Sequence, residues 1–176
     1  VFAVAKDEDT DRFITDMRPG NFYLDTPGIV ALTNPAELAL LRIPPGTLVH
    51  VAKADVKNMF HMLGVMEYLW TYLGLPPVQV EGVWYNVVLT SLPMGCSHSV
   101  CIAMHCLEFC LRYAKFHLYH RVGDIPVISD EPGRSVATTA YVDDIAAIGL
   151  DPELTDGVIH DATRRLEPHL PCSPSK

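Results

Sequence analysis

The sequence lacks the features that would place it in a membrane or outside the cell. It has no run of about 18 apolar residues, the length that a membrane-spanning helix requires. It shows no charged-then-apolar leader at its start, and its five cysteines include no C-x-x-C pair. We therefore expect an intracellular protein, in the cytoplasm or the nucleus, with reduced thiols and no membrane partner.

Basic residues are also few. The chain has 13 Lys and Arg against 21 Asp and Glu, which gives a formal net charge of −8. A free-standing nucleic-acid binder neutralises phosphates with Lys and Arg, so this balance argues against that class of protein. It does not argue against a metal site, because bound cations offset carboxylates locally.

What is present is the composition of a globular protein, with 49% hydrophobic and 19% charged residues in 176. Periodicity and turn residues predict a hairpin, a short helix, several strands and two longer helices. The expected elements are strands at 2–4 and 12–15, a helix at 35–41, a strand at 47–54 entering a helical turn, strands at 68–73 and 78–89 with a bend at Glu81-Gly82, a helix from 100 to about 118, a loop at 121–135, a hairpin around Asp143, and a helix at 152–166. This order predicts an α+β fold with an antiparallel sheet and helices on one face.

Two adjacent aspartates interrupt the apolar stretch ATTAYVDDIAAIG at residues 137–149. Carboxylates avoid apolar strand surroundings unless something pairs with them. A hairpin bend would lift Asp143 out of the strand and let it face Asp55, which ends a strand of its own. Facing carboxylates repel unless a cation lies between them, and Mg²⁺ prefers oxygen ligands. Asp55 and Asp143, with Asp144 close by, therefore form a minimal carboxylate set for two metal ions.

Two other interpretations compete with this one. A bare Asp-Asp pair is common in solvated turns. Cys101, His105, Cys106 and Cys110 lie close together on one expected helix, which invites a zinc hypothesis. The two i,i+4 pairs in that group point in different directions, and structural zinc usually takes ligands from loops, so buried thiols are the simpler interpretation.

Five segments, in order, give the sequence a resemblance to reverse transcriptases of retrotransposons and retroviruses, over essentially the whole chain. They are RFITDMRPGN (12–21), ADVKNMF (54–60), GVWYNVVLTSLPMGCSHS (82–99), YVDD (141–144) and LPCSPSK (170–176). The resemblance implies an RNA-directed DNA polymerase with a right-hand palm, a ferredoxin-like antiparallel sheet with helices on one face, plus part of the fingers. The implied divisions are fingers at 1–46, palm with the first aspartate at 47–66, fingers and palm strands at 67–92, and palm at 93–176. The thumb and RNase H regions of such enzymes have no counterpart in the sequence, so we expect a fragment that is inactive alone.

The resemblance also implies a role for each matched residue. Asp55, Asp143 and Asp144, with the main-chain carbonyl of Val56, would hold two Mg²⁺ ions, for which Mn²⁺ could substitute. Lys6 and Arg12 would contact the triphosphate of the incoming dNTP, and Lys176 would act as general acid. Phe60 would exclude a 2′-hydroxyl, Gly95 would allow close approach of the nucleotide, and Tyr141 would lie near the primer end. The partners would be an RNA or DNA template with its primer.

One position departs from the pattern, since Met94 stands where many relatives carry Gln. A thioether cannot donate the hydrogen bond that an amide can. Arg18 and Asn21 are expected to brace the fingers and not to touch substrate. The acidic balance and Met94 leave an alternative open, a non-catalytic palm-like scaffold, a nucleic-acid binding module or a decayed copy.

Overall fold

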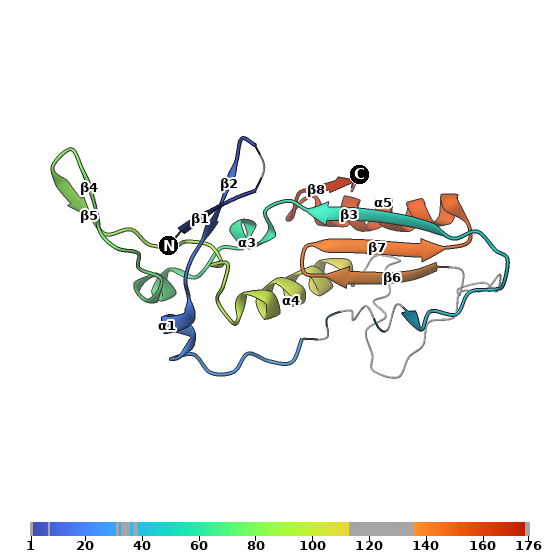
Figure 1. The fold of residues 1–176 in the computed structure, drawn as a ribbon, viewed down its shortest axis with the longest axis horizontal. Helices are drawn as coiled ribbons and strands as arrows, with labels where there is room; N and C mark the ends of the chain where they lie inside the picture. The colour runs from blue at the N-terminus through green and yellow to red at the C-terminus, as the bar shows by residue number, and fades with distance from the viewer. Residues whose placement is uncertain are drawn as a thin grey trace. The chain divides into compact units, whose positions relative to one another are not determined.

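The computed structural model describes residues 2–6, 8–30, 32, 36, 39–112 and 136–174. The elements in chain order are β1 (Phe2–Ala5), β2 (Asp11–Ile14), α1 (Arg18–Asn21), β3 (His50–Val56), α3 (Met59–Met62), the 3-10 helix η1 (Glu67–Tyr72), β4 (Val78–Val80), β5 (Val83–Tyr85), α4 (Ser99–Leu111), β6 (Val136–Tyr141), β7 (Asp144–Gly149), α5 (Pro152–Leu166) and β8 (Cys172–Pro174) (Figure 1). The fold is α+β with antiparallel sheets, as the sequence predicts. The chain divides into two compact units, one of residues 1–28 and 58–102 and one of residues 29–57 and 103–176.

The second unit contains a four-stranded antiparallel sheet in the order β6-β7-β3-β8 (Figure 1). Its strands alternate between buried and more exposed residues, because successive side chains point to opposite faces. Ala54, Val56, Ile145 and Ala147 lie on the buried face, with exposed fractions of 1% or less. Full burial of a side chain such as Ile145 contributes roughly 1.5–3 kcal/mol.

Helix α5 packs against β3 and β7. Asp151 caps its first turn, since Asp151 Oδ1 accepts a hydrogen bond from Leu154 N at 3.1 Å, and Pro152 occupies the first helical position. Its buried residues recur at helical spacing, namely Thr155, Val158, Ile159, Ala162 and Leu166. The helix has the bounds that the sequence predicts.

The first unit is built on two small hairpins. β1 pairs with β2 and β4 pairs with β5, each antiparallel and two-stranded. The bend of the second hairpin falls at Glu81-Gly82 as predicted, and both residues have positive φ, 49° and 81°. Paired positive φ values are typical of the type I′ turn, which matches the twist of the flanking strands.

One strand prediction is wrong. Residues 68–73 were expected to be extended, but Glu67–Tyr72 forms a 3-10 helix. Local hydrogen bonds hold it, from Leu69 N to Met66 O at 2.9 Å and from Trp70 Nε1 to Val65 O at 2.9 Å. The first extended pairing after this helix is the antiparallel bridge between Gly74 and Val88. The aromatic residues therefore lie just before the segment that pairs.

Other predictions have partial outcomes. Of the helix expected at 35–41, residues 36 and 39–41 are described, with helical backbone at 36 and 39. The loop at 121–135 and the end of the helix expected to run to 118 lie outside the described residues. None of the helices that the structure describes is long and apolar enough to cross a membrane. The divisions at 1–46, 47–66, 67–92 and 93–176 stay predictions.

Candidate active site

The strand register of the sheet sets Asp55 directly opposite Asp144 on β7. The same row continues to Tyr141 on β6 and to Ser173 on β8. Directly opposed residues of antiparallel strands share a face, and their Cβ atoms lie about 4.5–5.5 Å apart. Asp55, Asp144 and Tyr141 therefore lie side by side on the face opposite the buried rows.

Asp143 lies in the two-residue turn between β6 and β7. Its carbonyl oxygen accepts a hydrogen bond from Val56 N at 2.8 Å, which fixes the turn against the end of β3. Val142, the other turn residue, has a φ of 56°. A β-branched residue at positive φ is strained, and such strain persists only where the surroundings determine the conformation. The structure thus brings all three aspartates to one end of the sheet.

Asp55 and Asp143 are half-buried and Asp144 is exposed. No three His, Cys, Asp or Glu side chains in the described part of the chain are already arranged to hold a metal ion. Mg²⁺ typically uses one or two carboxylates and completes its octahedron with water and substrate oxygens, so it does not require a preformed cage. The carboxylate oxygens of these residues are donors of the kind that such a cation prefers.

Sequence reasoning missed the neighbours that β8 brings to this site. Ser173 lies opposite Asp55, and Cys172 lies beside it on the same strand. Burial, and then the negative charges of Glu167 and Asp55, raise the pKa of Cys172 to about 11, so its thiol stays protonated at neutral pH. Only long-range strand pairing reveals these contacts, because β8 is separated from β3 by more than 100 residues.

In the first unit, the β1–β2 hairpin carries the two predicted triphosphate contacts. Arg12 lies directly opposite Val4, and Lys6 directly follows the last residue of β1, two residues after Val4. Lys6 N donates to Thr10 O at 2.9 Å, so the ladder continues to that point. Every second residue of an extended chain points to the same face, so Lys6 lies on the face of Val4 and of its partner Arg12. Both side chains are exposed.

Phe60, Met94 and Gly95 also belong to the first unit. Phe60 is half-buried on α3, and Met94 is half-buried in the turn before α4. Gly95 has a φ of 100°, a conformation that favours glycine. Phe60, Lys6, Arg12, Met94 and Gly95 fall in one unit, and Asp55, Val56, Tyr141, Asp143 and Asp144 fall in the other.

Asn21 makes long-range contacts of the bracing kind within the first unit, whereas the side-chain bonds of Arg18 go to a residue two positions away. Asn21 makes side-chain hydrogen bonds to the main chain of Gly95 and Ser97, both at 2.9 Å. Arg18 pairs with Asp16 at 2.7 Å. This hydrogen-bonded pair lowers the pKa of Asp16 to about 2.

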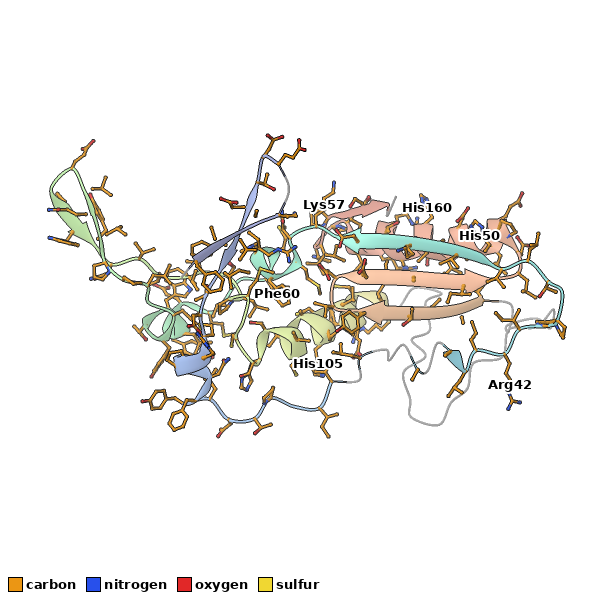
Figure 2. All side chains as sticks on the ribbon, viewed as in Figure 1. Arg42, His50, Lys57, Phe60, His105 and His160 are labelled. Atoms are coloured by element: carbon orange, nitrogen blue, oxygen red, sulfur yellow. The ribbon has the colours of Figure 1, made fainter. Side chains whose placement is uncertain are left out.

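A groove lies between β3 and α5, and Cys172 and Ser173 of β8 also line it. His50 of β3 and His160 of α5 are among its lining residues (both labelled in Figure 2), and His50 Nε2 lies 3.0 Å from Asp156 Oδ1. The residues that line this groove include none of the three aspartates. The groove and the row of Asp55 share Ser173.

Two further predictions can be placed only in part. Lys176 lies outside the described residues. Cys106 and Cys110 of α4 are half-buried, and burial raises the pKa of both thiols. The choice between buried thiols and a zinc site stays a prediction.

Comparison with known proteins gives a fold and no sequence family. Neither a protein-family model nor a curated protein matches the sequence. A solved structure, "Structure of the foamy viral protease-reverse transcriptase dRH in complex with ds DNA", aligns with 97% of this chain at a TM-score of 0.63 and 17% identity. The chain spans 25% of the length of that protein. At this identity the likeness concerns the fold, so the chain has a reverse-transcriptase-like fold.

Proposed function

We propose that this chain is the fingers and palm part of an RNA-directed DNA polymerase of a retroelement. The observation that carries the proposal is the strand register, which sets Asp55 opposite Asp144 and bonds Asp143 to the end of β3. The fold it shares with a viral protease–reverse transcriptase supports the same function. The reaction would add a dNTP to the 3′-hydroxyl of a primer paired with an RNA or DNA template.

Asp55 and Asp143 would hold two Mg²⁺ ions, with Mn²⁺ as a substitute, and Asp144 would be the weaker ligand. The main-chain carbonyl of Val56 would be the remaining ligand that the protein provides. Such ions, when bound, supply charge that stabilises the attacking and leaving oxygens of a phosphoryl transfer. The three carboxylates would also orient this charge, because the sheet register leaves them little freedom.

The first unit would bind the nucleotide. Arg12 suits a bidentate grip on phosphate and Lys6 supplies a point charge, and both project from one face of the β1–β2 hairpin. Phe60 would select against a 2′-hydroxyl, and Met94 and Gly95 would border the nucleotide. Tyr141, 52% exposed beside Asp144, would contact the primer end. Lys176 would donate the proton to the departing pyrophosphate.

Primer extension on an RNA template by the full-length protein tests this function. We expect Asp143→Asn to lower the extension rate at least a hundredfold, because a neutral amide offers the cations no charge. Asp144→Asn should have a smaller effect. Asp25→Asn makes the same chemical change at an exposed position and serves as the matched control. Unchanged extension by Asp143→Asn would exclude the proposed mechanism.

A palm-like scaffold or nucleic-acid binding module remains the second candidate. The departure at Met94 leaves it open, because a thioether cannot donate the hydrogen bond that an amide can. Binding of primer–template without Mg²⁺-dependent extension would support the scaffold over the enzyme.

A further inference from the structure

The side-chain amide of Asn21 links two segments of the first unit that are distant in sequence. Asn21 ends α1, and its Nδ2 donates to Gly95 O at 2.9 Å. Its Oδ1 accepts from Ser97 N at 2.9 Å. The orientation of the amide is unambiguous, because a carbonyl can only accept and a main-chain N–H can only donate.

Gly95 is closely packed on another side of the same turn. A Cβ atom built on Gly95 would lie 2.8 Å from the main-chain oxygen of Thr15, closer than real Cβ contacts. Thr15 is buried and directly follows β2. Thr15 and Asn21 therefore contact the turn from the same short segment.

The turn is also fixed from within. Ser99 Oγ donates to Pro93 O at 2.8 Å, and Cys96 N donates to the same oxygen at 3.2 Å. Ser99 is the first residue of α4, and its hydroxyl bonds backwards to Pro93. The turn is thus a rigid unit, and Asn21 and Thr15 attach it to the end of β2.

We infer that Asn21 is a positioning residue for the incoming nucleotide. It sets the turn of Met94 and Gly95 relative to the hairpin that carries Arg12, because β2 leads directly into the Thr15–Asn21 segment. This inference rests on the proposed function. It also gives a second reason for glycine at position 95, besides its positive φ, since any side chain there would displace Thr15.

The test measures dNTP KM and kcat during primer extension by the full-length protein. We expect Asn21→Leu, which removes both hydrogen bonds at similar volume, to raise the dNTP KM about tenfold with kcat within roughly twofold. Asn21→Asp keeps the acceptor for Ser97 N but sets a carboxylate oxygen against Gly95 O, so it should also raise KM. Ser97→Ala keeps the main-chain N–H and should leave KM unchanged.

A double-substitution cycle separates positioning from general damage. Gly95→Ala should also raise the dNTP KM, and its combination with Asn21→Leu should raise KM by less than the product of the two effects. The inference would be overturned if the increase in KM of the double substitution equalled the product of the two single increases, or if Asn21→Leu left KM unchanged.

Amide hydrogen exchange distinguishes this failure from failure of the proposed function, because it needs no activity. The Ser97 amide should exchange slowly in the unsubstituted protein and in Asn21→Asp, and faster in Asn21→Leu. Slow exchange with no primer extension would overturn the proposed function and the role of Asn21 in nucleotide binding. It would still support the clamp, by which we mean the hydrogen bonds of the Asn21 side chain with Gly95 and Ser97. Fast exchange in the unsubstituted protein would overturn the clamp itself.

Discussion

The two units hold their candidate functional groups by different physical means. In the four-stranded sheet, the acidic residues are set by a ladder whose opposite face is buried beneath α5. In the β1–β2 hairpin, Lys6 and Arg12 lie on a two-stranded ribbon whose residues are almost all exposed. A buried face fixes strand register strongly, whereas an isolated hairpin is marginally stable.

The difference suggests a division of labour. The proposed metal ligands would have to be held in a narrow geometry, which the buried sheet offers through Ile145 and Ala54, the neighbours of Asp144 and Asp55 along their strands. Phosphate contacts tolerate movement, since long basic side chains reach the ligand as it arrives. In this chain the exposed β1–β2 hairpin carries the long, flexible side chains of Lys6 and Arg12.

The largest expected effect contrasts the two sheets directly. Ile145→Ala should lower the free energy of unfolding by about 2–5 kcal/mol, because Ile145 is fully buried. Val83→Ala in β5, where Val83 is 54% exposed, should change it by less than about 0.5 kcal/mol. Urea unfolding followed by circular dichroism measures both. Equal effects would remove the contrast between the units.

A smaller effect is expected at the turn of the acidic row. Val142→Gly should raise the free energy of unfolding by about 1 kcal/mol, because glycine adopts the φ of 56° without the strain of a β-branched residue. Gly95→Ala is the converse control, since it introduces a side chain at positive φ and should destabilise. A loss of stability in Val142→Gly would show that packing of the valine outweighs the strain.

The smallest effect concerns the exposed pair of Asp16 and Arg18. The pKa of Asp16 is lowered from an ordinary 3.8 to about 2 by the hydrogen bonds from Arg18. The pair therefore contributes its stabilisation above pH 3.8 and loses it as the pH falls towards 2. Carboxyl-carbon NMR titration should show this pKa, and Arg18→Gln should return it towards 3.8. An Asp16 pKa that stays near 2 in Arg18→Gln would identify another cause.

Sequence patterns predicted elements well where local signals agreed. α5 was placed correctly because apolar periodicity and Pro152 both marked it, and the hairpin at 136–149 because two β-prone arms flank the aspartates. The segment Glu67–Tyr72 was misjudged because aromatic residues favour strands only when a partner strand is present.

The site was predictable only in part, for a physical reason. Asp55 and Asp143 could be identified from their positions at strand ends, since a turn in one strand faces the end of another. Ser173 and the clamp that Asn21 forms on Gly95 and Ser97 depend on pairings across 74 residues or more, and no local pattern encodes them. The likeness to a family indicates which residues matter, and only the fold shows what each one contacts.

The most direct test of the central claim is a Mn²⁺ titration of the protein, followed by electron paramagnetic resonance, with Mg²⁺ as competitor. If Asp55, Asp143 and Asp144 share a cation, Asp55→Asn and Asp143→Asn should each weaken Mn²⁺ binding at least tenfold, whereas Asp25→Asn should not. Without metal, Asp55→Asn should raise the unfolding temperature, because it removes repulsion between facing carboxylates. Equal Mn²⁺ affinity in Asp55→Asn and the unsubstituted protein would contradict the claim.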